Sequence, residues 1–166
     1  MKLAEEKKII LLASDMDYDD ADPQTLKGIN MKGYHSCTFL IDIGTMLTAD
    51  ATVKAYSGAT DGDLSTALAF KYAYGASTCV QGSIASGADV LAAETTVTAA
   101  TGLVIAYATY ANYMLQIEVD ASMMDVADGE EWLTLSYTTG TATGPSSIWA
   151  VLDPRYTKNR SATALA

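Results

Sequence analysis

The strict alternation of side chains in residues 113–119 constrains the fold more than any other feature of the sequence. Tyr113, Leu115, Ile117 and Val119 occupy one set of alternate positions, and Met114, Gln116 and Glu118 occupy the other. Because successive side chains of a β-strand point to opposite faces, this pattern predicts a strand with one face in a core and the other at a wetter surface.

Strand-like segments of the same kind recur along the chain, separated by turn-rich stretches at intervals of about a dozen residues. They cover residues 9–13, 26–31, 35–43, 50–57, 68–72, 103–109, 132–137 and 148–152. The chain has no convincing amphipathic helix, and we expect only one brief helix or turn, over residues 121–127. The pattern predicts an all-β chain that forms an antiparallel β-sandwich of the jelly-roll or Ig-like kind.

The length of 166 residues is most economically explained by one domain, which can bury well over half of its unfolded surface without metals or disulfides. We expect an N-terminal arm over residues 1–21, a sandwich domain over residues 22–156 and a loose C-terminal tail over residues 157–166. Acidic residues and Pro23 mark the loop that separates the arm from the sandwich.

The charge of the chain is strongly negative and unevenly distributed. Its formal net charge is −10, and no Lys or Arg lies between Lys71 and Arg155. Because nucleic-acid binding depends on cations that neutralise phosphates, we expect no nucleic-acid partner.

Residues 7–13 start with two lysines and continue as an apolar run, which invites comparison with a signal peptide. The run is too short for that purpose, and acidic residues follow it almost at once. No segment reaches the roughly eighteen apolar residues that a membrane span requires. We therefore expect a soluble protein with no export signal and no membrane partner.

The two cysteines, Cys37 and Cys79, are too few for a zinc ribbon or a disulfide scaffold, although a single bridge between them stays open. His35 lies two residues before Cys37 and is expected on the same strand face, at the edge of the core. Side chains at such positions are about 6 to 7 Å apart, which is too far for the hydrogen bond of a catalytic pair. We expect no enzyme activity and no catalytic residue.

Residues 15–20 begin like a calcium-binding loop, with acids at alternate positions. The resemblance ends at Asp20, where such a loop needs glycine, and at Leu26, where it needs a bidentate glutamate. Asp61-Gly-Asp63 is a weaker case of the same kind. We expect a solvated acidic arm, no metal site and no cofactor.

Trp149 and Met114 are apolar residues at positions that alternation assigns to an outer face. Trp149 is out of phase with Ile148, Ala150 and Leu152, and Met114 shares its face with Gln116 and Glu118. Such residues suggest contacts with other subunits, and for Trp149 the alternative is a position under the N-terminal arm. Trp132, Trp149 and the ten tyrosines also leave open a carbohydrate-binding platform, where aromatic faces stack on sugar rings.

Four blocks of the sequence, in this order, resemble the small β-sandwich structural proteins of tailed-bacteriophage heads. They are residues 28–44 (GINMKGYHSCTFLIDIG), 68–72 (LAFKY), 113–120 (YMLQIEVD) and 149–156 (WAVLDPRY). The resemblance extends over roughly residues 22–165 and leaves out the acidic N-terminal arm.

The resemblance implies a non-enzymatic virion protein, made in the cytoplasm of a host bacterium and bound to the outer surface of the capsid. Its expected role is that of a decoration or auxiliary protein, with the major capsid protein as partner and with association between its own copies. The alternatives are a head–tail adaptor or fibre-base subunit, and the carbohydrate-binding module. Candidate interaction residues are Met114, Trp149, Arg155 and Tyr156.

Overall fold

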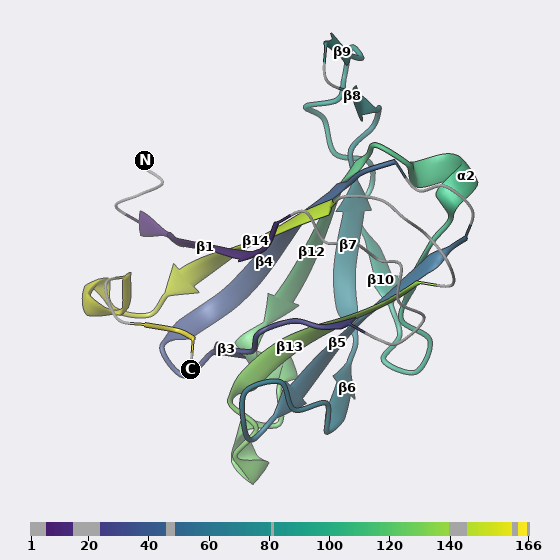
Figure 1. The fold of residues 1–166 in the computed structure, drawn as a ribbon. Helices are drawn as coiled ribbons and strands as arrows, with labels where there is room; N and C mark the ends of the chain where they lie inside the picture. The colour runs from purple at the N-terminus through teal and green to yellow at the C-terminus, as the bar shows by residue number, and fades with distance from the viewer. Residues whose placement is uncertain are drawn as a thin grey trace.

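The computed structural model describes residues 6–14, 24–45, 49–80, 82–139, 146–160 and 163–165. In this part of the chain, two six-stranded sheets face each other, and a small two-stranded hairpin projects at one end (Figure 1). Every pairing between strands is antiparallel. The predicted all-β antiparallel sandwich is therefore confirmed.

The first sheet, sheet A, has the strand order β1-β14-β4-β12-β7-β10. Its strands are β1 (Lys8–Ala13), β14 (Ser146–Pro154), β4 (Tyr34–Ile43), β12 (Met114–Asp120), β7 (Phe70–Tyr74) and β10 (Thr95–Val97). The longest strands, β4 and β14, pair along nearly their whole length. This pairing is the longest in sheet A.

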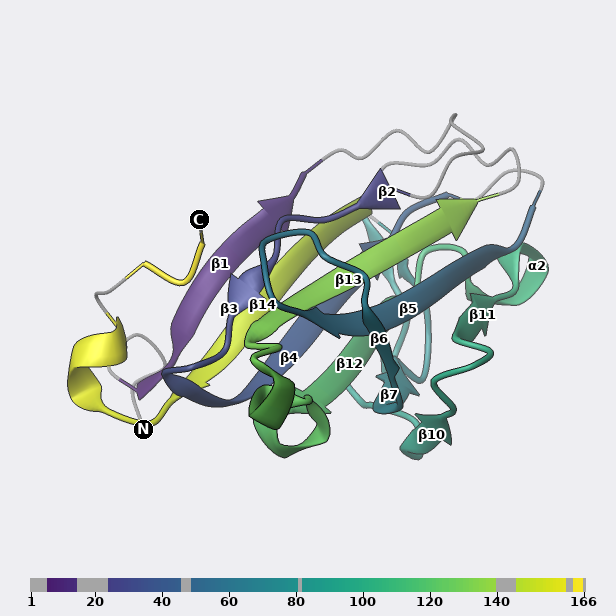
Figure 2. The same cartoon turned by 90° about the horizontal axis from the view of Figure 1, so that it is seen from below.

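The second sheet, sheet B, has the order β11-β5-β13-β2, with β3 also paired to β13 and β6 to β5. Figure 2 shows β13 and β5 crossing in front of the strands of sheet A. The strands are β11 (Leu103–Ile105), β5 (Ala51–Gly58), β13 (Trp132–Thr139), β2 (Gln24–Thr25), β3 (Ile29–Asn30) and β6 (Thr66–Leu68).

The remaining elements are short. The projecting hairpin consists of β8 (Cys79–Val80) and β9 (Ser83–Ile84). Helical turns are α2 (Tyr107–Tyr110), η1 (Ala121–Met123), η2 (Val126–Asp128) and η3 (Thr157–Arg160). Within the described residues, none of these turns is long enough to span a bilayer.

The alternating strand that dominates the sequence is β12, in the middle of sheet A. Leu115, Ile117 and Val119 are completely buried, whereas Glu118 on the opposite face is exposed. Ile117 lies opposite Phe39 of β4 on one side and Tyr72 of β7 on the other. The predicted division of this strand into a core face and an outer face is confirmed.

Three predicted strands end earlier than expected or are interrupted. The strand over residues 103–109 stops at Ile105, and α2 follows, with the carboxylate of Asp50 accepting a hydrogen bond from the Tyr107 N–H (3.0 Å). Tyr110 in this turn stacks on Tyr74 at 3.7 Å between ring centroids. Residues 26–31 and 68–72 are also not continuous strands.

The expected position of His35 on the core face is wrong, because β4 contains a bulge. Asp153 of β14 lies opposite Ser36 and Pro154 lies opposite Tyr34, so His35 is an extra residue in the ladder. A bulge shifts the side-chain phase by one position. Tyr34 therefore points into the core together with Cys37, and His35 is exposed.

Both ends of the chain contribute to the sandwich. The predicted strand at residues 9–13 exists as β1, which pairs with β14 at the edge of sheet A. Near the other end, Ala164 is buried in the core and its carbonyl accepts a hydrogen bond from the Asn30 N–H (2.8 Å). Residues 163–165 are thus packed against the domain, which differs from the loose tail expected from the sequence.

The central position of β12 generates a test of the core. Ile117→Ala should reduce the free energy of unfolding by about 2–5 kcal/mol, because a fully buried side chain leaves a cavity in a strand flanked on both sides. Denaturant unfolding measures this change. Glu118→Ala, on the exposed face of the same strand, should change stability by less than about 0.5 kcal/mol. Equal losses in the two variants would contradict the assignment of faces.

Candidate interaction surface

An apolar patch covers the outer face of sheet A where β1 meets β14. It consists of Ile9, Leu11 and Trp149, which are 45%, 46% and 42% exposed. Leu11 lies directly opposite Trp149, and Trp149 lies opposite Leu40 of β4. The three side chains thus form one surface on adjacent strands, which we call the apolar patch.

Trp149 is held on this face by the burial of its neighbours. Ile148, Ala150 and Leu152 are completely buried on the core side of β14. Because alternate residues of a strand point to opposite faces, Trp149 cannot turn inward without exposing all three. Its exposure is therefore a fixed consequence of the packing of sheet A.

Met114 lies on the same outer face as Trp149, but on β12, and it is only half-buried. It is opposite Asp42 of β4, which in turn faces Ser147 of β14. Met114 is therefore two strands away from β14 and separated from the apolar patch by β4.

Arg155 and Tyr156 lie elsewhere, where β14 has ended. The Arg155 backbone N–H donates to the Gly33 carbonyl (2.9 Å), and its Nε donates to the Tyr34 carbonyl (2.9 Å). These bonds fix the turn that follows β14 to the turn before β4. Tyr156 is 65% exposed. Of the four candidate residues, Met114 and Trp149 thus lie on the outer face of sheet A, and Arg155 and Tyr156 lie beyond the end of β14.

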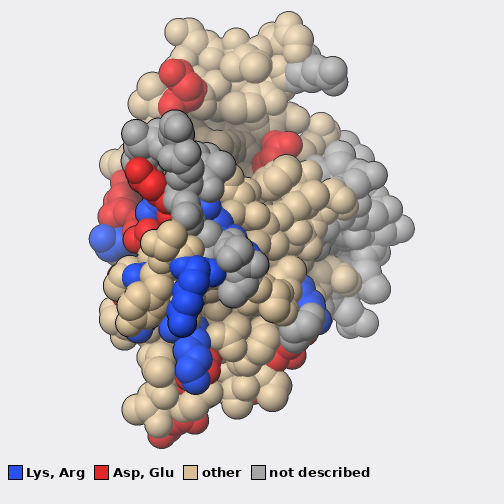
Figure 3. All heavy atoms as spheres, turned by 90° about the vertical axis from the view of Figure 1, so that its left-hand side faces the viewer, with Lys and Arg blue, Asp and Glu red and all other residues tan. Residues whose placement is uncertain are grey.

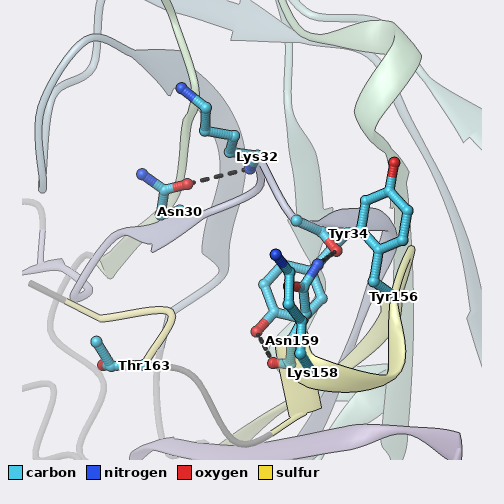
Figure 4. A pocket seen from close by; sticks show the side chains of 8 residues that line it. Asn30, Lys32, Tyr34, Tyr156, Lys158, Asn159 and Thr163 are labelled. Atoms are coloured by element: carbon cyan, nitrogen blue, oxygen red, sulfur yellow. Dashed lines mark hydrogen bonds between the residues drawn. The ribbon is translucent and has the colours of Figure 1, made fainter.

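A pocket of about 300 Å³ opens beside Tyr156 (Figure 4). The Tyr34 hydroxyl donates to the Asn159 carbonyl (2.7 Å), and Asn159 Nδ2 donates to the Gly33 carbonyl (2.6 Å). Burial raises the pKa of the Tyr34 hydroxyl. The lining residues are Asn30, Lys32, Gly33, Tyr34, Tyr156, Lys158, Asn159 and Thr163.

A smaller cavity of about 110 Å³ lies next to this pocket and shares Lys32 with it. It is lined by Met31, Lys32, Ala121, Val126, Glu131 and Arg155. The two cavities together give this end of the molecule a concave surface that combines aromatic, aliphatic and cationic groups.

Four cations, Lys7, Lys32, Arg155 and Lys158, lie at this end of the molecule among acidic side chains. Lys7 pairs with Asp153 (2.6 Å) and Lys32 with Glu131 (3.2 Å). Figure 3 shows Lys and Arg atoms gathered in a band on this side of the molecule.

The Cys–His pair considered from the sequence does not form, since Cys37 is buried and His35 is exposed on the other side of the strand. Burial raises the pKa of the Cys37 thiol well above its usual value, which makes it unreactive. Cys79 is exposed in β8, and both cysteines are free. The bridge that the sequence left open is absent.

Of the two acidic motifs compared with calcium-binding loops, only Asp61-Gly-Asp63 lies in the described part of the chain. Residues 15–20 lie outside the described part of the chain. Asp61 accepts a hydrogen bond from the Gly28 N–H (2.6 Å) and pairs with Lys27, and Asp63 accepts hydrogen bonds from the Ala59 N–H and the Ser65 hydroxyl. These carboxylates hold loops together. The described residues contain no group of three or more ligands that could hold a metal.

Sequence reasoning missed two members of the apolar patch, Ile9 and Leu11. The available signal was that residues 9–12 are apolar at every position. A strand that is apolar on both faces has both faces covered or leaves one apolar face outside. Ile10 and Leu12 pack against the core, and Ile9 and Leu11 are therefore left on the outer face.

Comparisons with known proteins give only distant similarities. No family model matches the sequence, and no curated protein is significantly similar to it. The chain is similar to the SPBc2 prophage-derived protein YomS, with a TM-score of 0.40 and 10% identity over 89% of this chain and 92% of that chain. For a chain of the T13 IBDV viral particle, the TM-score is 0.25 and the identity 13%, over 96% of this chain and 42% of that chain. Both scores are too low to assign a fold family or a function.

The environment of Asp61 generates a prediction about pH. The side-chain bond to Lys27 and the bond from the Gly28 N–H lower the pKa of Asp61 below its usual value. A carboxylate with a lowered pKa in the folded state stabilises the protein above its unfolded pKa, and this contribution is lost as the pH falls through the folded pKa. Urea unfolding of Asp61→Asn should therefore show lower stability at neutral pH and a weaker loss of stability in acid.

The Asp89→Asn variant is the control for this experiment, because the Asp89 side chain is exposed. It should follow the wild-type pH curve. The role assigned to Asp61 fails if Asp61→Asn and the wild type lose stability in parallel on acidification.

Proposed function

We propose that the chain is a non-enzymatic structural protein of a tailed-bacteriophage virion. In this role it is a decoration or auxiliary protein that binds the outer surface of the capsid shell, with the major capsid protein as its partner. The sequence resemblance to β-sandwich proteins of phage heads suggests this class. The observation that carries the assignment of a binding surface is the apolar patch, in which Trp149 is fixed outward by the sheet itself.

The patch has the properties expected of the centre of a protein contact. Aromatic residues are enriched at such centres, and Trp149 is flanked by the two aliphatic side chains of β1. Because β1 and β14 are paired strands of a packed sheet, little conformational freedom is lost when a partner covers them. A rigid apolar surface of this kind favours attachment to a preformed lattice.

The free energy gained by covering the patch limits how tightly one copy can bind. Covering three half-exposed apolar side chains yields on the order of 3 kcal/mol, less than the cost of about 4–15 kcal/mol for immobilising a free protein. One patch alone therefore binds weakly, and attachment depends on further contacts or on many linked copies. A protein that binds only the assembled lattice stabilises that lattice by mass action.

A carbohydrate-binding module is the second candidate, favoured by two exposed aromatic side chains, Trp149 and Tyr156. Stacking of a sugar ring on Trp149 would use the same flat surface. The two aromatic residues lie on a sheet face and in a turn at the end of the strand, however, and not on one platform. The protein contact is therefore the better supported function.

Trp149→Ala tests the proposed function in co-sedimentation with particles of the parent phage that lack this protein. Binding should fall roughly tenfold or more, because a central aromatic contact is removed. The fold should be retained, since the side chain is exposed. Val104→Ala, which removes an exposed apolar side chain from β11 of sheet B, should bind as the wild type does.

Two results would contradict the proposal. One is a wild-type protein that does not bind such particles; the other is a Trp149→Ala variant that binds them with unchanged affinity. Binding of the wild type to a glycan array, lost in Trp149→Ala, together with no binding to particles, would favour the carbohydrate module instead.

A further inference from the structure

Strand β1 forms one edge of sheet A and is the longest edge strand of the described sandwich (Figure 2). It has six residues and, among the described strands, pairs only with β14. The other strands at the margins of the two sheets, β10, β11, β2, β3 and β6, have two or three residues each. Proteins commonly protect sheet edges by keeping the outermost strands short. The edge at β1 is not protected in this way.

The backbone of residues 9–12 is hydrogen-bonded on one side only. In the part of the chain that the structure describes, it makes no backbone hydrogen bond to any segment other than β14. The C-terminal residues 163–165 bond to Asn30 of β3 in sheet B instead. An edge strand presents its remaining N–H and C=O groups as a template for a further strand. Residues 9–12 contain neither a proline nor a charged side chain, either of which would oppose such an addition.

The side chains of β1 are apolar on both faces of the strand and are only partly covered. Ile9 and Leu11 are exposed on the outer face. Ile10 and Leu12 pack against the core but are only half-buried, whereas Ala150, opposite Ile10 on β14, is completely buried. The difference arises because β1 has a neighbouring strand on one side only. A further strand would therefore cover side chains on both faces of β1.

This edge is complementary to itself in the antiparallel direction. When two copies of β1 pair with Ile10 opposite Ile10, Ile9 of each copy lies opposite Leu11 of the other, so apolar side chains meet on both faces. The shift of register between Leu11 and Ala13 lies outside these pairs, whereas a pairing centred on Leu11 would include it. A parallel pairing would place the two Lys8 side chains next to each other. The antiparallel pairing separates them by about four residues, or roughly 13 Å.

We propose that two copies of the protein pair through β1, antiparallel and centred on Ile10, so that their two A sheets form one continuous sheet. The contact is isologous, because each copy contributes the same strand, and the pair is closed. A second copy is the occupant that this edge favours, because the strand matches itself on both faces. Closure of the pair also leaves no open edge at β1 to which further chains could add.

The pairing joins the apolar patches of the two copies. Its two-fold axis is perpendicular to the sheet, so both outer faces point to the same side. Leu11 of one copy then lies next to Ile9 of the other, and Ile9 is itself opposite the half-buried Val151 of its own β14. One apolar surface thus extends from Trp149 of one copy to Trp149 of the other. The strand contact does not depend on the proposed function, but the joined surface supplies the linked copies that one weak patch requires.

Disulfide formation tests the contact and its register. Ile9→Cys and Leu11→Cys, which replace exposed side chains, are made separately in a Cys79→Ser background that lacks the exposed native thiol. Directly opposite residues of paired strands have Cα atoms about 4.5–5.5 Å apart, which a disulfide bridges, whereas diagonal neighbours are about 7–8 Å apart. A mixture of the two variants should therefore form a disulfide-linked dimer on mild oxidation, and neither variant alone should do so. Equal dimer formation by either variant alone, or no dimer in the mixture, would overturn the proposed pairing.

Analytical ultracentrifugation provides the second measurement. The wild type should form dimers at concentrations up to about 1 mM. Ile9→Lys should weaken this association about tenfold or more, because a lysine in an edge strand opposes the addition of another strand. The matched control is Val104→Lys, which places the same charge at an exposed apolar position of β11 in sheet B and should associate as the wild type does. Circular dichroism and thermal unfolding confirm that both variants fold.

Equal weakening by the two lysine variants, or a wild type that stays monomeric, would overturn the proposal. Slow hydrogen exchange of the amides of residues 9–12 in such a monomer would show that another part of the same chain covers the edge. Particle binding is measured separately from self-association. A monomeric wild type that binds particles would contradict the pairing and leave the proposed function standing, whereas a dimer that binds no particles would do the reverse.

Discussion

The pairing of β4 with β14 on one side and β12 on the other is the constraint on which the rest of the structure depends. In all three strands, alternate side chains are completely buried between the two sheets, among them Phe39, Ile117 and Ala150. A slip of β12 by one residue would bury Glu118 and expose Ile117. The same register determines which side chains lie on the outer face. The exposure of Trp149 is therefore as firmly determined as the burial of the core side chains.

The long strands could be predicted from the sequence, because each has one buried face and a clear alternation. The predicted strand over residues 35–43 corresponds to β4, and the one over residues 132–137 lies within β13. The bulge at His35 could not be predicted, since it arises from pairing with Pro154 at the end of a distant strand. The hairpin at Ile84 was also missed, because its Ser- and Gly-rich surroundings carry no periodic pattern.

Trp149 and Met114 could be placed on an outer face from alternation alone, and the structure puts them there. Alternation could not indicate that Trp149 has Leu11 as its neighbour, because the pairing of β1 with β14 joins opposite ends of the chain. Alternation also could not show that Trp149 lies apart from Arg155 and Tyr156, because all three belong to the same short segment of the sequence. What distinguishes them is that β14 ends between them and the chain turns towards β4.

The described structure exposes an apolar patch on one face of sheet A, a projecting hairpin at one end and a pocket at the opposite end. A cryo-electron microscopy map of the parent phage particle is the most direct test of the central claim. The proposal predicts density for this sandwich on the outer surface of the shell, with Trp149 covered by the major capsid protein. Density for the chain inside the shell or at the tail alone, or a Trp149 face open to solvent, would contradict it.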